Sequence, residues 1–309
     1  MKHIKPYKIF ESASPGPNFP TTREEVMQVC EKYHITRYTI NDDLSIDVGS
    51  YVYLDKKGLK YLPLKFNYVS GNFDCSHNKL KTLEGCPQTV GGIFDCEFNK
   101  LVSLEGCPQT IEGNFNCSHN ELQSLEGCPQ TIEGNFNCGH NGLTSLEGCP
   151  QTVTGGFGCS SNELTTLEGC PQTAGKYFDC SYNKKLKSLN GSPQKVEGDF
   201  NCSGNNLKTL ESGPQTVGGN FNCSFNKLKD LEHISEVNGT IYIYRNPVHL
   251  LLNTFINKAD TFMIEDFIDY EIVRNKDTVM LDRLQTFIRD NDLEMPDLEE
   301  IKKKYKIIE

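Results

Sequence analysis

The sequence predicts an elongated α/β solenoid in which short repeats stack on one another. Three observations lead to this fold class. A unit of 21 residues recurs through the middle of the chain, the same residue types return at fixed places in each unit, and the two ends lack the pattern. A unit this short cannot bury its own apolar face, so it must stack on its neighbours. The repeats therefore predict one extended body with caps.

The pattern divides the chain into four segments. Residues 1–20 form a flexible leader and linker, because 12–20 are rich in Ser, Pro and Gly. Residues 21–49 form an N-terminal cap, residues 50–246 form a solenoid of about ten coils, and residues 247–309 form a helical C-terminal cap. Terminal repeats would otherwise expose the core, so covering elements are expected at both ends.

The N-terminal cap is predicted to begin with a helix. Thr22 and Glu25 form a capping box, and the helix runs to about Tyr33. A pair of strands that turns around residues 41–43 then leads into the first coil. The residues expected on the buried side of the helix are Val26, Met27 and Cys30.

One repeat unit explains why the pattern recurs. It reads Gly71-Asn-Phe-Asp-Cys-Ser-His-Asn-Lys-Leu-Lys-Thr-Leu-Glu-Gly-Cys-Pro-Gln-Thr-Val-Gly91. The alternation over Phe73-Asp74-Cys75 predicts a short strand with the phenylalanine and the cysteine inward. Leu80 and Leu83 fill the core on the return path, and the segment 84–87 ends regular structure at the back of the coil.

An asparagine follows each strand cysteine by three residues. Its amide can both donate and accept hydrogen bonds, so it can satisfy backbone groups that a turning chain leaves without partners. We predict that these asparagines form a structural ladder, which comprises Asn78, Asn99, Asn120, Asn141, Asn162, Asn183, Asn205 and Asn226.

The fourteen cysteines are predicted to be packing residues. From Cys75 to Cys180 they are separated by alternating gaps of 11 and 10 residues, whereas structural zinc sites use close pairs. A disulfide ladder is the alternative, since equivalent residues on neighbouring coils lie about 4.8 Å apart. Their parallel Cβ atoms fit a disulfide poorly, and free cysteine is a common buried residue. We therefore favour free thiols in the core.

The pattern Phe-x-Cys-x-x-Asn-x-Leu-x-x-Leu resembles the leucine-rich repeat family, with Phe and Cys in two of the usual leucine positions. The resemblance covers roughly residues 44–250, and Lys57 departs from it by replacing the first asparagine. The back-of-coil phrase Leu-Glu-Gly-Cys-Pro-Gln-Thr resembles a Cys/Pro-rich subgroup encoded largely by tailed bacteriophages and some bacteria. The resemblance implies a horseshoe with parallel strands on its concave face and the binding of a partner protein, but no specific partner.

Composition and motifs exclude several other classes of function. The net charge of −10 argues against nucleic acids and anionic membranes as partners. No phosphate-binding loop, dinucleotide fingerprint or hydrolase motif occurs, and residues 247–309 contain no cysteine for the ligase chemistry of some bacterial leucine-rich-repeat proteins. His119 and His140 could approach within about 5 Å but lack further ligands. We expect no enzyme activity, no cofactor and no metal.

The helices expected in the C-terminal cap cover residues 248–256, 261–272, 278–289 and 296–304. We expect this segment mainly to cover the last coil, with a second binding role as the alternative.

The favoured function is recognition of a protein partner by a soluble, monomeric, cytoplasmic module, in the host cytoplasm if a phage encodes it. Function should lie in the outward positions of the strands and turns, which vary while the core positions do not. The predicted partner-binding residues are Asp74, His77, Asp95, Phe98, His119, His140, Tyr177, Tyr182, Phe225 and Tyr242.

The alternative is a protein associated with the virion or the capsid interior. Residues 1–11 resemble the capsid-targeting leaders of some tailed phages, and Ile9-Phe-Glu11 resembles a prohead protease site.

Overall fold

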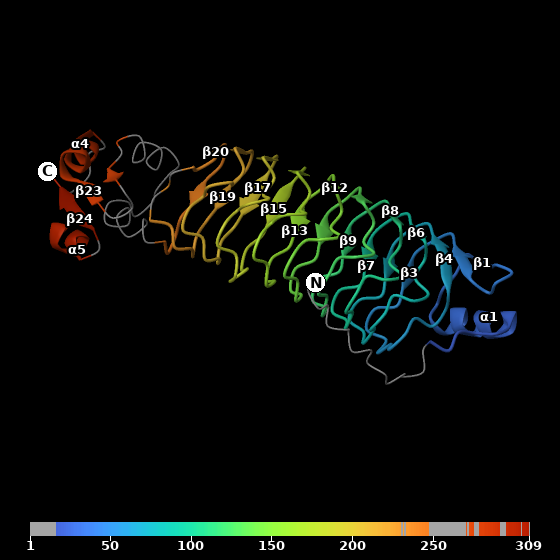
Figure 1. Ribbon diagram of the computed structural model, residues 1–309. Helices are drawn as coiled ribbons and strands as arrows, with labels where there is room; N and C mark the ends of the chain where they lie inside the picture. The colour runs from blue at the N-terminus through green and yellow to red at the C-terminus, as the bar shows by residue number, and fades with distance from the viewer. Residues whose placement is uncertain are drawn as a thin grey trace, which may run out of the picture.

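The computed structural model describes residues 17–229, 231, 233–246, 270, 272–274, 278–290, 295–303 and 305–308. The leader at 1–11, the expected helix at 248–256 and most of the expected helix at 261–272 lie outside the described residues. The coils of residues 50–246 stack into an elongated body, shown from blue to orange in Figure 1.

Each coil contributes a first strand to a parallel sheet of ten strands in the described coils. Equivalent residues pair in register, as Phe94 does with Phe115. This confirms the predicted strand at the phenylalanine of each unit. The first strands are β3 (Val52–Tyr53), β5 (Phe73–Asp74), β7 (Phe94–Asp95), β9 (Phe115–Asn116), β11 (Phe136–Asn137), β13 (Phe157–Gly158), β15 (Tyr177–Asp179), β17 (Asp199–Asn201), β19 (Phe221–Asn222) and β21 (Ile241–Tyr242).

A second strand follows the back-of-coil turn, which the sequence did not predict. In these strands Val, Ile or Ala points inward and the preceding residue faces outward. Two residues give too short an alternation of apolar and polar positions for a strand to be recognised in the sequence. The second strands are β4 (Phe66–Val69), β6 (Thr89–Val90), β8 (Thr110–Ile111), β10 (Thr131–Ile132), β12 (Thr152–Val153), β14 (Thr173–Ala174), β16 (Lys195–Val196), β18 (Thr216–Val217) and β20 (Glu236–Val237).

The coils are therefore β-structure on two sides, and no helix lies in residues 50–229, 231 or 233–246. The α/β class that the sequence predicted is corrected to a parallel-strand β-solenoid. The reason is the back of the coil, where a turn such as that at Gly85, with φ of +92°, leads directly into a second strand. Left-handed φ values favour glycine, which explains why this position repeats as glycine.

Ladders of identical side chains fill the core between the two sides. The phenylalanine rings of neighbouring coils lie 5.1 to 5.9 Å apart, and the leucines at the two return positions are buried. All fourteen cysteines are buried and free, as predicted. Burial disfavours the thiolate of Cys138 and raises the pKa of this group to about 12, so Cys138 is an unreactive packing group.

The asparagine ladder is confirmed in atomic detail. Asn120 donates from Nδ2 to the carbonyl oxygens of Cys96 in the preceding coil (3.0 Å) and of Cys117 (3.1 Å) and Ser118 (3.1 Å) in its own coil. Its Oδ1 accepts from the backbone N–H of Leu101 at 3.0 Å. One side chain thus ties two consecutive turns together, and the pattern continues to Asn246 in the last coil.

The lysine inserted at 184–185 is absorbed by a shift in this ladder. Asn205 Oδ1 accepts from the backbone N–H of Asn183 at 2.6 Å, where the other coils offer the N–H of a leucine. Leu186 N–H donates instead to the carbonyl of Asn183 within its own coil. The strand register on both sides is preserved, since Phe178 still pairs with Phe200.

The N-terminal segment matches the expected helix and strand pair. Helix α1 (Arg23–Lys32) has Thr22 as its N-cap, and β1 (Tyr38–Ile40) pairs antiparallel with β2 (Ile46–Val48). Strand β2 pairs with β4, so the hairpin extends a five-stranded sheet, β1-β2-β4-β6-β8. The other second strands, β10 to β20, form a six-stranded sheet that continues the same side of the solenoid. Val26 and Cys30 are buried, but Met27 is 46% exposed and its predicted burial is wrong. Met27 follows Val26 directly, and consecutive residues of a helix do not share one face.

The C-terminal segment combines strands with helices, in contrast to the purely helical prediction. Strands β22 (Val273–Arg274), β23 (Thr278–Met280) and β24 (Lys306–Ile308) form a sheet of three strands in the described residues. Helix α4 (Leu281–Asp290) starts later than expected because β23 occupies 278–280, and α5 (Leu298–Lys302) lies inside the expected 296–304. β-branched Thr278 and Val279 favour a strand over the first turn of a helix.

We predict that Asn120→Ala lowers the free energy of unfolding by about 3 kcal/mol, because buried carbonyls and one N–H lose their partner. Asn238 is exposed, so the control Asn238→Ala should change stability by less than about 0.5 kcal/mol. Urea denaturation measures both. A cost below about 1 kcal/mol for Asn120→Ala would contradict a structural role for the ladder.

Candidate functional site

The turn after each first strand presents one position per coil at the surface, just before the ladder asparagine, and these residues are exposed or partly exposed. We call these positions the turn row. Each has a positive φ between 49° and 70°, and the residues are Lys56, His77, Phe98, His119, His140, Ser161, Tyr182, Gly204, Phe225 and Arg245.

The left-handed backbone of the turn row argues that its side chains have a role outside the fold. A non-glycine residue in this conformation costs on the order of 1 kcal/mol relative to glycine. The backbone is held there by hydrogen bonds to the next coil, such as His119 N–H to the carbonyl of Gly139 at 3.1 Å. Within the row, all of which the structure describes, Gly204 is the one glycine. Large side chains therefore occupy positions where glycine would make the folded protein more stable.

Four rings of the turn row form a continuous stack along the solenoid axis. The ring centroids lie 4.5 Å apart for His77 and Phe98, 4.0 Å for Phe98 and His119, and 4.1 Å for His119 and His140, with interplanar angles of 9°, 8° and 11°. Because each ring covers the face of its neighbour, a partner would meet mainly the ring edges. Burial, with the neighbouring His140 adding to it, lowers the pKa of His119, which favours the neutral form of this imidazole.

A group of carboxylates lies beside the first half of this stack. Glu97 Oε1 is 3.6 Å from His77 Nε2, and Glu97 Oε2 accepts from Asn116 Nδ2 at 2.8 Å. Asp74 and Asp95 are in register on adjacent strands. Burial, with Glu97 and Asp74 contributing, raises the pKa of Asp95 to about 6. Glu97 was not among the predicted site residues. Most other repeats have Ser or Gly at the equivalent position, so the sequence pattern did not mark it.

The outward residues of the first strands are largely structural. Asp74 Oδ1 accepts from Ser76 N–H at 2.9 Å, and Asp95 Oδ1 accepts from Glu97 N–H at 3.0 Å, so both side chains cap the turn that follows. Asparagines before the strand form a further ladder, in which Asn114 Oδ1 accepts from Asn135 N–H at 2.8 Å. The sequence interpretation took both positions as variable surface. Their hydrogen bonds to the backbone explain why Asp and Asn dominate there.

Tyrosine side chains fill places that glycines leave open. A Cβ added to Gly156 would lie 2.1 Å from the ring of Tyr177, so this tyrosine covers the glycine and is half-buried. Burial raises its pKa, and Asp179 adds to the shift. Tyr177 covers a glycine of the preceding coil, whereas Tyr182 leans over Gly204 of the following coil. Tyr182 nevertheless remains 54% exposed. Of the two, Tyr182 is thus the more available to a partner.

The last coils add residues that the sequence interpretation missed. The guanidinium carbon of Arg245 lies 5.3 Å from the ring centroid of Phe225 and 5.6 Å from that of Tyr244. Tyr242, which was predicted, is exposed at the end of its strand. Arg245 occupies the turn-row position of the last coil. Its place just before Asn246 in the sequence could have identified it as a member of the row.

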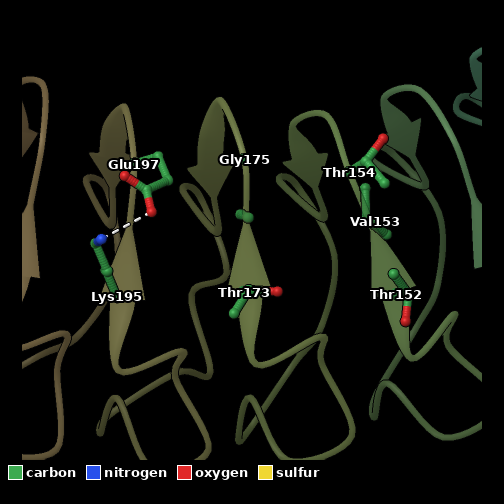
Figure 2. Close-up of a pocket in the computed structure, with 8 residues that line it drawn as sticks. Thr152, Val153, Thr154, Thr173, Gly175, Lys195 and Glu197 are labelled. Carbon is green, nitrogen blue, oxygen red and sulfur yellow. Dashed lines mark ion pairs between the residues drawn. The ribbon is translucent and has the colours of Figure 1, made fainter.

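The second sheet carries a shallow hollow of about 230 Å³ on the other side of the coil. It lies where Ala174 replaces the Val or Ile of other coils, and it is bordered by Thr152 and Thr173. Figure 2 shows Lys195 and Glu197 at its edge, joined by an ion pair of 2.8 Å. With its cation already paired, the hollow offers little to an anionic ligand.

Other kinds of site find no support in the part of the chain that the structure describes. No group of three or more His, Cys, Asp or Glu residues there could hold a metal ion. Nor is any described helix long and apolar enough to cross a membrane.

Comparison with known proteins reveals a likeness in structure but none in sequence. No family model matches the chain, and no curated protein matches it. Among solved structures, YopM from Yersinia enterocolitica WA-314 is similar, with 18% sequence identity and a TM-score of 0.36. The match covers 62% of this chain and 52% of that chain, so this chain spans about half the length of the structure it matches.

The fold itself defines the class of protein. The chain is a parallel-strand β-solenoid in which a strand, a turn and a hydrogen-bonded asparagine recur once per coil.

We predict that Asp95→Asn raises stability at neutral pH. The folded protein holds a proton on Asp95 up to about pH 6, whereas the unfolded chain releases it near pH 3.9. The stability contributed by this carboxyl is complete below about pH 4 and is lost as the pH rises through about 6. Discounted for partial exposure, the gain at pH 7.5 should be about 1 kcal/mol, and it should vanish near pH 4.

Urea denaturation at both pH values tests this prediction. Coils with Asn116 and Asn137 show that the amide fits the turn. Asp95→Ala is the control, because it also removes the charge but leaves Glu97 N–H without its acceptor. A stability difference between Asp95→Asn and the parent that does not change with pH would refute the assignment.

Proposed function

We propose that the chain is a non-enzymatic recognition module that binds a partner protein through the turn row and the adjoining first-strand sheet. The observation that carries the proposal is the turn row itself. Its rings are exposed apart from the partly buried His119, they follow one line along the solenoid, and their backbone conformation favours glycine. The neighbouring ladders account for the fold without them.

The composition of this surface suits a protein partner. Aromatic rings framed by polar groups are typical of the anchors of protein interfaces. Phe98 is 42% exposed and Phe225 is 44% exposed. Neighbouring serine, asparagine and carboxylate side chains provide the polar surround, and the carboxylates disfavour a nucleic acid.

The resemblance of the repeats to a phage-encoded subgroup makes a host cytoplasmic protein the first candidate partner. A horseshoe curvature that places the first strands on a concave face belongs to the same proposal, as does a monomeric state without a cofactor or a metal. The virion-associated alternative rests on residues 1–11, outside the described residues.

Affinity capture with the immobilised full-length chain, followed by mass spectrometry, tests the proposal. We expect Tyr182→Ser combined with Phe225→Ser to reduce capture of the partner at least about tenfold. Serine already occupies the turn row at Ser161, so the variant should unfold at a temperature close to that of the parent.

The matched control changes exposed residues away from the turn row. Tyr68 lies on a second strand and Val102 on the return path, and both are exposed. Tyr68→Thr combined with Val102→Thr should leave capture unchanged. Equal loss of partner in both double variants, or full capture by the turn-row variant, would count against the proposal.

A further inference from the structure

The turn row is interrupted at Ser161, between the rings of His140 and Tyr182. We call this position the Ser161 gap. The stack ends at His140, and no ring contact joins His140 to Tyr182 in the part of the chain that the structure describes. Tyr182 leans away from the gap, over Gly204. The other small residue of the row, Gly204, is therefore covered by a ring, whereas in the described residues no ring contact extends from His140 toward Ser161.

The spacing of the coils leaves room for one planar group at the gap. Neighbouring parallel strands lie about 4.8 Å apart, so the coils of His140 and Tyr182 are separated by about 9.6 Å. Since the Tyr182 ring leans away over Gly204, a planar group on the Ser161 coil would face the ring of His140 at about 4.8 Å. That distance is close to the 4.0 to 4.5 Å between rings within the stack. An inserted plane would extend the stack by one member beyond His140.

The charge of the surrounding surface selects a cation. The four outward positions of each coil, from the residue before the strand phenylalanine to the turn row, carry two cations, Lys56 in the first coil and Arg245 in the last. The acidic residues at these positions are Asp55, Asp74, Asp95, Glu97, Asp179 and Asp199. A positively charged partner segment would be attracted to this surface.

The chain already pairs a guanidinium with a ring of the turn row. Arg245 occupies the row position after Phe225, with its guanidinium carbon 5.3 Å from the ring centroid. A guanidinium is flat and weakly hydrated and stacks on aromatic faces, while an ammonium is a compact and strongly hydrated charge. The geometry at Phe225 therefore favours arginine over lysine as the group that the row accepts.

We propose that the Ser161 gap binds the guanidinium of an arginine in a basic segment of the partner protein, stacked on the ring of His140. This assignment rests on the proposed function and specifies the chemistry of its partner. Arginine supplies both features that the gap selects, a planar face and a positive charge.

Calorimetric titration of the full-length chain at physiological ionic strength tests the assignment. The probe is a synthetic peptide of alternating glycine and arginine, and the comparison peptide replaces each arginine by lysine at the same charge. We expect the arginine peptide to bind about 5- to 10-fold more tightly than the lysine peptide.

Two substitutions at the gap separate stacking from charge. Ser161→Phe fills the gap and should lower the affinity for the arginine peptide to that for the lysine peptide. Phe98 and Phe225 show that phenylalanine is accommodated at this φ, and circular dichroism confirms folding of the variant. Ser161→Ala keeps the gap open and should bind the arginine peptide like the parent.

Equal binding of the two peptides, undiminished binding by Ser161→Phe, or no binding of either peptide would overturn the assignment. Tighter binding of a glycine–tyrosine peptide would overturn it as well, in favour of an aromatic occupant. These outcomes leave partner capture by the turn row intact, so they are distinguishable from failure of the proposed function.

Discussion

The hydrogen bonds of the ladder asparagines are the constraint on which the rest of the structure depends. Each amide joins the end of one strand to the turn of the preceding coil, as Asn120 joins Cys117 and Cys96 to Leu101. Without these bonds, buried carbonyls at every turn would lack partners, at a cost of about 1–3 kcal/mol each. The ladder therefore sets the register of the phenylalanines, leucines and cysteines that fill the core.

The same constraint produces the exposed surface. Because the asparagine fixes the turn, the residue before it is held in the left-handed region, and its side chain is displayed once per coil. The coil spacing then brings rings such as Phe98 and His119 to 4.0 Å, close enough to stack. The core ladders are nearly invariant, while the turn row holds rings, serine, glycine and cations. Variation is thus concentrated at the position that the backbone exposes.

Much of the scaffold could be predicted from the sequence, and the reasons for the failures are physical. The period located the first strands and the asparagines because each occurs once per coil with a strong residue preference. The second strands were missed because two residues such as Thr89-Val90 carry no period. Asp74 and Asp95 looked like free surface, since a hydrogen bond from a side chain to a nearby backbone N–H leaves no sequence pattern of its own. The sequence predicted only part of the turn row. The stacking of its rings and the position of Arg245 depend on how neighbouring coils are aligned, which the sequence alone does not show.

The central claim is that partners meet the turn row, and photocrosslinking tests it most directly. A benzoyl-phenylalanine is placed at Tyr182 in one variant and at Tyr68, on the second sheet, in another. After irradiation in producing cells, the account predicts a covalent adduct with the captured partner from position 182 and none from position 68. An adduct from position 68 with none from position 182 would contradict the account.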